Sequence, residues 1–175
     1  LGLEILIFAI LSFFLLIIYP LMKRYFKMPQ LILGLAFGSS IPMVFIVETG
    51  NMDINCFLLY FLTVIWAIVY DTYYAMADKK DDEKIGVQSS AIFFGDNDIK
   101  ISKYLHFLVI TIFLVIGLLN NFNLFFYLCI LVSCLCIIYQ NLLVSNRIPY
   151  QCISAFENNN IFGLIVTFGL IFNYL

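Results

Sequence analysis

Residues 70–95 read YDTYYAMADKKDDEKIGVQSSAIFFG, and they follow an almost unbroken apolar run, CFLLYFLTVIWAIV, at residues 56–69. The segment carries a cluster of acids, namely Asp71, Asp78, Asp81, Asp82 and Glu83. Acids this close together repel one another, and carboxylates resist leaving water. Their position at the end of an apolar segment long enough to enter a membrane therefore indicates that the negative charges have a specific function.

The composition places the chain in a membrane. It has 175 residues, of which 63% are hydrophobic and only 11% are charged. A soluble domain of this length cannot bury so much apolar surface, so lipid must be part of its solvent. The nine Lys and Arg residues are too few and too scattered for a nucleic-acid-binding surface, and we expect no nucleic acid partner. The five cysteines lack metal-ligand spacing and are interpreted as small buried hydrophobic residues.

Six segments are long and apolar enough to approach the ~20 residues that a spanning helix needs. They are residues 3–22, 31–47, 54–77, 104–119, 124–143 and 160–175. The predicted fold class is therefore all-α, a polytopic transmembrane helix bundle. In the second span, GLAFGSSIP at residues 34–42 predicts close helix packing at Gly34 and Gly38, with a kink near Pro42.

All nine basic residues fall in connections on one side of this scheme. They are Lys23, Arg24, Lys27, Lys79, Lys80, Lys84, Lys100, Lys103 and Arg147. The positive-inside rule makes that side cytoplasmic and puts Leu1 at the outer face. A chain that begins inside a span is expected to be part of a longer protein, so we interpret residues 1–175 as one transmembrane domain that is incomplete at its N-terminus.

The acids form a stripe if the third helix continues past Ala77. At about 100° per residue, Asp78 and Asp82 fall within about 20° of Asp71, whereas Asp81 points about 80° away. Mg²⁺ prefers carboxylate oxygens and often bridges to phosphates, so the stripe fits a divalent-cation site. The alternative is a solvated acidic loop that alternates with lysines. Spacing alone leaves both interpretations open.

The first basic connection, YPLMKRYFKMPQ at residues 19–30, has the opposite charge. Pro20 predicts a kink or a helix end. Tyr19 and Lys23 are four residues apart and share a helix face, and Arg24 adds a second cation. The cluster is either an ordinary membrane anchor or a cationic patch that faces the acidic stripe and binds an anion such as a pyrophosphate or a carboxylate.

Two polar features remain in the second half of the chain. The only histidine, His106, is expected at the membrane interface rather than in catalysis. In AFENNNIFG, residues 155–163, the three asparagines Asn158 to Asn160 are predicted to cap the N-terminus of the sixth span and to make hydrogen bonds at the interface.

Three stretches resemble the UbiA family of membrane prenyltransferases: YPLMKRYFKMPQLILGLAFGSSIPM, WAIVYDTYYAMADKKDDEKIGVQSSAIFFG and AFENNNIFGLIVTFGL. The resemblance covers essentially the whole chain. The family pattern D-x-x-Y-A-x-x-D-x-x-D-D-x-x-x-G-x-x-S is matched by Asp71, Tyr74, Ala75, Asp78, Asp81, Asp82, Gly86 and Ser89. Asp78 and Asp82 stand as the family's second D-x-x-x-D element, and Tyr19 and Lys23 match its Y-x-x-x-K element.

The resemblance implies a bundle of nine transmembrane helices around a cavity open to lipid, of which this chain corresponds to helices four to nine. The family's first Asp-rich motif, N-D-x-x-D-x-x-x-D, is absent from this sequence, so we expect activity to require a longer protein. The implied activity is Mg²⁺-dependent transfer of a polyprenyl group from a polyprenyl diphosphate to an aromatic ring. YPLMKR and YDTYYAMAD favour 4-hydroxybenzoate as the acceptor, hence ubiquinone biosynthesis at the bacterial inner membrane, with the charged loops cytoplasmic.

The resemblance also assigns roles to residues. The expected metal ligands are Asp71, Asp78, Asp82 and Asp81. The expected substrate contacts are Tyr19, Lys23, Arg24, Tyr74 and Lys84, and the residues expected to act in catalysis are Asp71, Asp78, Asp82, Lys23 and Arg24. The alternatives are a family member with another aromatic acceptor, an ion-coupled transporter whose acids line an ion path, and a non-functional remnant.

Overall fold

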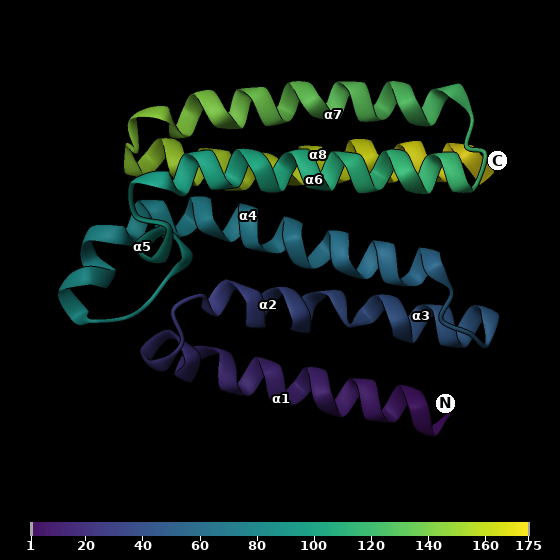
Figure 1. Ribbon diagram of the computed structural model, residues 1–175, viewed down its shortest axis with the longest axis horizontal. Helices are drawn as coiled ribbons and strands as arrows, with labels where there is room; N and C mark the ends of the chain where they lie inside the picture. Colours follow the sequence, from purple (N-terminus) through teal and green to yellow (C-terminus); the bar gives the residue numbers. More distant parts are fainter. Residues whose placement is uncertain (1, 175) are drawn as a thin grey trace.

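The computed structural model describes residues 2–174, which form an all-helical bundle (Figure 1). The helices are α1 (Leu3–Tyr25), α2 (Pro29–Gly38), α3 (Ser40–Thr49), α4 (Ile54–Ile85), α5 (Ser90–Phe94), α6 (Asp98–Leu119), α7 (Leu124–Leu143) and α8 (Pro149–Tyr174). Short 3₁₀ turns cover Gly95–Asn97 and Val144–Asn146. Within the described residues, six stretches are long and apolar enough to cross a membrane, which confirms the predicted fold class. The expectations for Leu1 and Leu175 lie outside the described residues.

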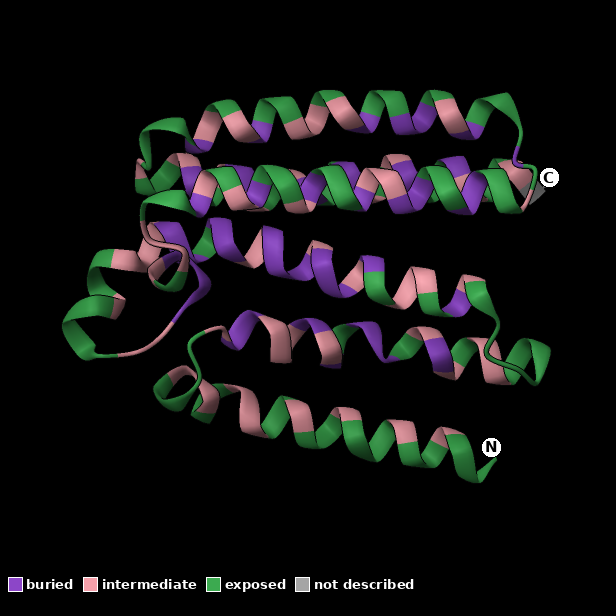
Figure 2. Ribbon diagram, in the orientation of Figure 1, coloured by how far each residue is buried: buried purple, intermediate pink, exposed green. Residues whose placement is uncertain are grey.

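Helix α4 is the centre of the bundle. It packs against α2 on one side and against α6 and α8 on the other, while α1 covers α2 and α3, and α7 covers α8 (Figure 1). A cluster of apolar side chains, including Leu62, Phe113, Phe126 and Phe162, fills the space between α4, α6, α7 and α8. By contrast, none of the described residues of α1 is buried (Figure 2).

The second span is broken where the sequence predicts a kink. Helix α2 ends at Gly38 and α3 begins at Ser40. Pro42 has no N–H to donate to the Gly38 carbonyl. The Ser39 hydroxyl donates to the Ala36 carbonyl at the same break. The close approach of α2 and α4 is also confirmed, because a Cβ on Gly34 would lie 2.9 Å from the Val64 carbonyl oxygen.

Helix α4 is much longer than a bilayer requires. Its 32 residues rise about 48 Å, against a hydrocarbon core of about 30 Å. The Asp53 side chain caps its N-terminus by accepting from the Cys56 N–H at 2.9 Å. Gly86, with φ of +73°, ends it in a left-handed turn in which the Gly86 N–H bonds the Asp82 carbonyl. The acidic segment is therefore helical, and its last turns extend beyond the hydrocarbon.

Two other helices begin earlier than the predicted spans, and one expected helix end is absent. Helix α1 continues through Pro20 to Tyr25, so of the two outcomes expected at Pro20, a kink or a helix end, the helix end does not occur. Helix α6 begins at Asp98 rather than residue 104. Helix α8 begins at Pro149 rather than residue 160. Proline is favourable at the first position of a helix, because a backbone N–H there would have no partner within the helix.

The early start of α8 corrects the predicted N-cap at Asn158 to Asn160, which lie inside the helix. The amides of Asn158 and Asn159 bond neighbouring helices instead. Asn158 Oδ1 accepts from Gln140 of α7 at 3.0 Å, and Asn159 Oδ1 accepts from Trp66 Nε1 of α4 at 2.9 Å. His106 is buried within the bundle, beside Tyr73 of α4.

Candidate functional site

The candidate site lies at one end of the bundle. We call this end, which holds Lys23, Asp82, Asp98 and Arg147, the polar end. The connection between α1 and α2, the last turns of α4, α5 and the α7–α8 loop all meet there (Figure 1). Each element brings charged or polar side chains that the apolar spans themselves lack.

Lys23 is the cation that meets the acids. Its ammonium lies 5.6 Å from the centroid of the Tyr19 ring, one turn earlier on α1. It interacts electrostatically with Asp71 and Asp82 of α4. The Tyr19 hydroxyl also interacts with Asp71. The structure thus brings Tyr19 and Lys23 opposite the carboxylate stripe. This arrangement matches the interpretation of the basic connection as a cationic patch that faces the acids.

The stripe itself runs along one face of α4. Asp78 lies in the electrostatic field of both Asp71 and Asp82, and the Tyr74 hydroxyl interacts with Asp78. All three carboxylates are only partly exposed. Like charges held this way destabilise a helix unless a cation balances them. Lys23 supplies one positive charge, which leaves a net negative site.

The carboxylate stripe can bind a metal ion only if waters or a ligand complete the coordination. Among the described residues, no group of three His, Cys, Asp or Glu side chains is placed to enclose a metal by itself. Mg²⁺, however, is usually held by one or two carboxylates together with waters and substrate phosphates. Spread carboxylates on one helix face are suited to that second arrangement, in which the ligand supplies part of the coordination.

The remaining predicted residues lie at the margin of this cluster. Arg24 is exposed, and within residues 2–174 no hydrogen bond or ion pair joins it to the acids. Asp81 pairs with Lys84 at 2.8 Å, with their side chains 80% and 72% exposed. These two residues satisfy each other at the surface and do not meet Lys23.

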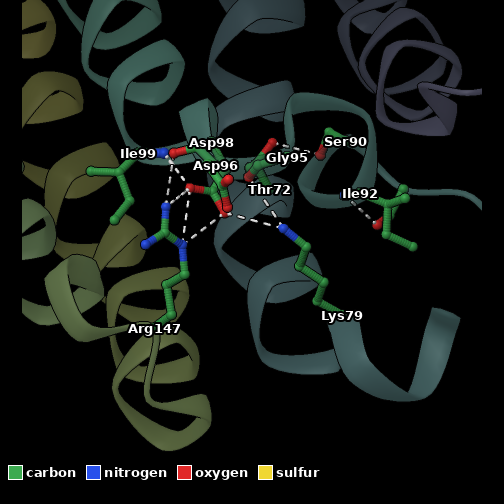
Figure 3. Close-up of polar contacts among 10 residues, drawn as sticks. Thr72, Lys79, Ser90, Ile92, Gly95, Asp96, Asp98, Ile99 and Arg147 are labelled. Carbon is green, nitrogen blue, oxygen red and sulfur yellow. Dashed lines mark hydrogen bonds and ion pairs between the residues drawn. The ribbon is translucent and has the colours of Figure 1, made fainter.

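A buried polar network supports Asp71, and the sequence did not identify it. Gln30 is 2% exposed, and its side chain interacts with Asp71. Its Oε1 accepts from the Ser90 N–H at 2.8 Å, and the Ser90 and Thr72 hydroxyls lie 2.7 Å apart (Figure 3). In the sequence, the only indication of this network is Gln30, a polar residue at the start of an apolar span.

A backbone contact joins the basic connection to the loop after α4. The Gln88 N–H donates to the Lys23 carbonyl. Gln88 belongs to the short loop between Gly86 and Ser89, the two small residues of the acidic motif. The Ser89 side chain then accepts from the Ile92 N–H and starts α5. The loop therefore holds the end of α1 against the acidic end of α4.

A second charged cluster fixes α4 from the other side (Figure 3). The Asp98 side chain is fully buried and accepts two bonds from Arg147 Nε, at 3.1 and 3.2 Å, and one from Arg147 Nη2. Lys79 of α4 approaches the same carboxylate at 3.8 Å and donates to the Gly95 carbonyl at 3.1 Å. Arg147 Nη2 also donates to the Asp96 carbonyl at 3.0 Å. Hydrogen bonding to Asp98 raises the pKa of the Arg147 guanidinium above its ordinary value, so the cation stays charged.

An aromatic cavity adjoins the acids within the bundle. It has a volume of about 250 Å³ and is lined by Phe37, Trp66, Tyr70, Phe156, Asn159 and Asn160. Tyr70 immediately precedes Asp71, and its ring lies 5.8 Å from that of Phe156. The aromatic side chains of this cavity can hold a flat apolar group.

Comparisons with known proteins agree on one family. The sequence model described as the UbiA prenyltransferase family matches residues 1–166. A 4-hydroxybenzoate octaprenyltransferase from Enterobacter sp. (strain 638) is 44% identical over 157 residues, which are 90% of this chain and 54% of that protein. The protein of the same name from Escherichia coli O139:H28 is 43% identical over the same shares. This chain thus spans about half the length of the curated relatives it matches.

Solved structures share the fold. A UbiA homologue from Aeropyrum pernix K1 superposes with a TM-score of 0.79 at 19% identity, covering 97% of this chain and 64% of that one. A structure of digeranylgeranylglyceryl phosphate synthase gives a TM-score of 0.77 at 20% identity, over 98% and 62%. With the family match over nearly the whole sequence, these findings show that the chain belongs to the UbiA prenyltransferase family.

Proposed function

We propose that the protein transfers a polyprenyl group from a polyprenyl diphosphate to 4-hydroxybenzoate, giving 3-polyprenyl-4-hydroxybenzoate for ubiquinone biosynthesis. The observation that carries the proposal is the junction of Lys23 and Tyr19 with Asp71 and Asp82 at the edge of the aromatic cavity. The names of the relatives with 43–44% identity support this acceptor. We further propose that residues 1–175 are the C-terminal part of one transmembrane domain in a longer protein.

The reaction breaks the bond between the allylic carbon and the diphosphate oxygen, and the diphosphate leaves with the bonding electrons. The ring carbon ortho to the phenol hydroxyl then bonds to the allylic carbon, and the ring loses a proton. Lys23 is placed to bind the diphosphate and to balance its growing charge in a partly dry site. Tyr19 positions Lys23 through its ring, and Arg24 provides a second cation for the diphosphate or for the acceptor carboxylate.

The carboxylates of the stripe are the residues that would hold magnesium. Asp71, Asp78 and Asp82 are the main candidates, and Asp81 is a fourth at the surface. Bound Mg²⁺ supplies Lewis-acid stabilisation of the departing diphosphate. Gln30 keeps Asp71 oriented through its bond to Ser90. Tyr74 beside Asp78 and Lys84 beside Asp81 are the remaining proposed substrate contacts.

An assay of the complete gene product in membranes tests this function. Membranes that contain the protein are incubated with 4-hydroxybenzoate, a polyprenyl diphosphate and Mg²⁺, and the prenylated product is quantified. Homogentisate and a dihydroxynaphthoate serve as competing acceptors. Turnover of one of these in preference to 4-hydroxybenzoate would overturn the proposed acceptor while keeping the reaction class.

The basic connection gives a prediction about three neighbouring cations. We expect Lys23→Ala and Arg24→Ala each to lower kcat/KM by about ten- to a hundredfold, because each removes a charge-assisted contact of about 1.5–3 kcal/mol. Lys27→Ala is the matched control, since Lys27 is exposed beyond the end of α1. Equal and mild losses of kcat/KM from all three substitutions would show that the basic cluster is an ordinary membrane anchor.

The direction of insertion gives a further prediction. We propose that the protein lies in the bacterial inner membrane with the polar end in the cytoplasm, because the nine basic residues all lie on that side. Reporter fusions after Lys84 and Arg147 are then expected to report the cytoplasm, and fusions after Asn51 and Asn121 the outer face. A cytoplasmic signal from the Asn121 fusion would contradict this orientation.

A further inference from the structure

A groove between α6 and α7 opens on the outer surface of the bundle, away from the Lys23 junction. It has a volume of about 230 Å³, and its walls are mostly apolar. Phe107 of α6 and Ile138 of α7 border it and are 72% and 57% exposed. Lys103 is the one charged residue that lines it. Because both helices are spans, the apolar part of this groove faces hydrocarbon and Lys103 stands toward the polar end.

Unpaired polar atoms gather around the same two helices. Among the described side chains, the buried nitrogen and oxygen atoms without a hydrogen-bond partner are Ser102 Oγ, His106 Nε2, Gln140 Oε1 and Asn141 Oδ1. Of these four residues only His106 lines the groove, because Ser102 is fully buried and Gln140 is buried with its amide nitrogen bonded to Asn158 of α8. An unpaired buried polar atom costs about 1–3 kcal/mol, so His106 Nε2 indicates a polar occupant of the groove.

One ring nitrogen of His106, Nε2, lacks a hydrogen-bond partner. The other, Nδ1, lies 3.4 Å from the Tyr73 hydroxyl on α4, and the histidine is 1% exposed. A Tyr73 hydroxyl that donates to Nδ1 leaves Nε2 as an N–H donor. Such a donor is satisfied by an ester carbonyl oxygen, which is the group that joins a lipid acyl chain to its glycerol.

We propose that the α6–α7 groove binds one membrane phospholipid with an anionic headgroup. An acyl chain lies between Phe107 and Ile138, its ester carbonyl accepts from His106 Nε2, and the phosphate pairs with Lys103. The occupant is a lipid because the groove is apolar over most of its length and opens to the bilayer. It is anionic because the only charged wall residue is a cation.

Lipid retention by the complete gene product tests the proposal without an activity assay. The protein is purified in mild detergent, mixed with phosphatidylglycerol or phosphatidylcholine of the same acyl chains, and analysed by native mass spectrometry. We expect preferential retention of phosphatidylglycerol, and a loss of about fivefold in that retention for Lys103→Gln. Lys100→Gln is the matched control, because Lys100 is exposed on the same helix and does not line the groove. It is expected to retain lipid as the unmodified protein does.

Two further arms separate the alternatives. Cys134→Phe fills the apolar part of the groove, and we expect it to lower the retention of both phospholipids. Inorganic phosphate in excess is expected to leave phosphatidylglycerol bound, whereas displacement by phosphate would identify a free-anion site and overturn the lipid proposal. Equal retention by the Lys103→Gln and Lys100→Gln variants would also overturn it, and both exposed substitutions are expected to fold.

Discussion

Replacing either acid of the D-x-x-x-D element, as Asp78→Asn or Asp82→Asn, is expected to lower prenyl transfer by about a hundredfold or more in the complete gene product. The amide keeps the size of the side chain and removes its charge, so it binds a divalent cation more weakly than the carboxylate does and no longer balances the charge of Lys23. Asp82 interacts electrostatically with Lys23, and Asp78 lies between the other two acids of the stripe. Initial rates across a Mg²⁺ titration measure the effect.

Neighbouring acids supply the controls. Glu83→Gln removes an exposed charge from the same turn of α4 and is expected to leave the rate within about twofold. Asp81→Asn is expected to have an intermediate effect, since Asp81 pairs with Lys84 in solvent but belongs to the family pattern. A near-normal rate for Asp78→Asn or Asp82→Asn at every Mg²⁺ concentration would show that the substituted acid is not an essential metal ligand.

The parts of the site that could be predicted from the sequence are those set by helical periodicity. Asp71, Asp78 and Asp82 share a face because seven and eleven residues are close to whole turns, and Tyr19 and Lys23 share one because four residues are close to one turn. The observed α4 extends far enough for this pattern to apply to all three acids. Opposite charges on two connections at one membrane face then predict that the two faces meet.

The parts that could not be predicted depend on contacts between distant residues. Gln30 bonds Ser90, sixty positions away, and Arg147 bonds Asp98, forty-nine positions away. Neither pair has a periodic signature. Asp98 also explains why the start of α6 was misplaced, because a lone acid before an apolar run resembles a solvated connection until its ion pair with Arg147 is known. In α8, the amides of Asn158 and Asn159 reach α7 and α4, so a polar run that resembles a helix start lies inside the helix.

These distant contacts give the site its rigidity. The acidic turns of α4 extend beyond the hydrocarbon, where lipid does not support them. The Gln88 contact holds them to α1, and the Lys79 contact with Asp98 holds them to α6 and the α7–α8 loop. A diphosphate site needs its charges held in place before the substrate binds, because reorganising them during the reaction would raise the barrier. We therefore propose that the charged cluster at Asp98 holds the acidic turns of α4 in position.

Asp98→Ala is expected to lower the free energy of unfolding by about 1–3 kcal/mol, because it removes the buried carboxylate that Arg147 bonds three times, while the 38% exposed Arg147 side chain is partly solvated by water once it is unpaired. Denaturant titration in mixed micelles, followed by circular dichroism, measures the change. Asp96→Ala is a close control, since only the Asp96 backbone carbonyl bonds Arg147 and that carbonyl is kept, so we expect a change within about 0.5 kcal/mol.

The double variant Asp98→Ala with Arg147→Ala separates the pair from its surroundings. Once both charges are gone, no buried ion is left uncompensated, so the double variant is expected to be more stable than the sum of the two single losses predicts. Lys79 limits the recovery, because its ammonium lies 3.8 Å from the same carboxylate and also loses a partner. A coupling energy of about 1 kcal/mol or more between the two positions is the expected result. Additive losses within about 0.5 kcal/mol would mean that Asp98 stabilises the polar end through packing, and that the ion pair does not fix the acidic turns of α4.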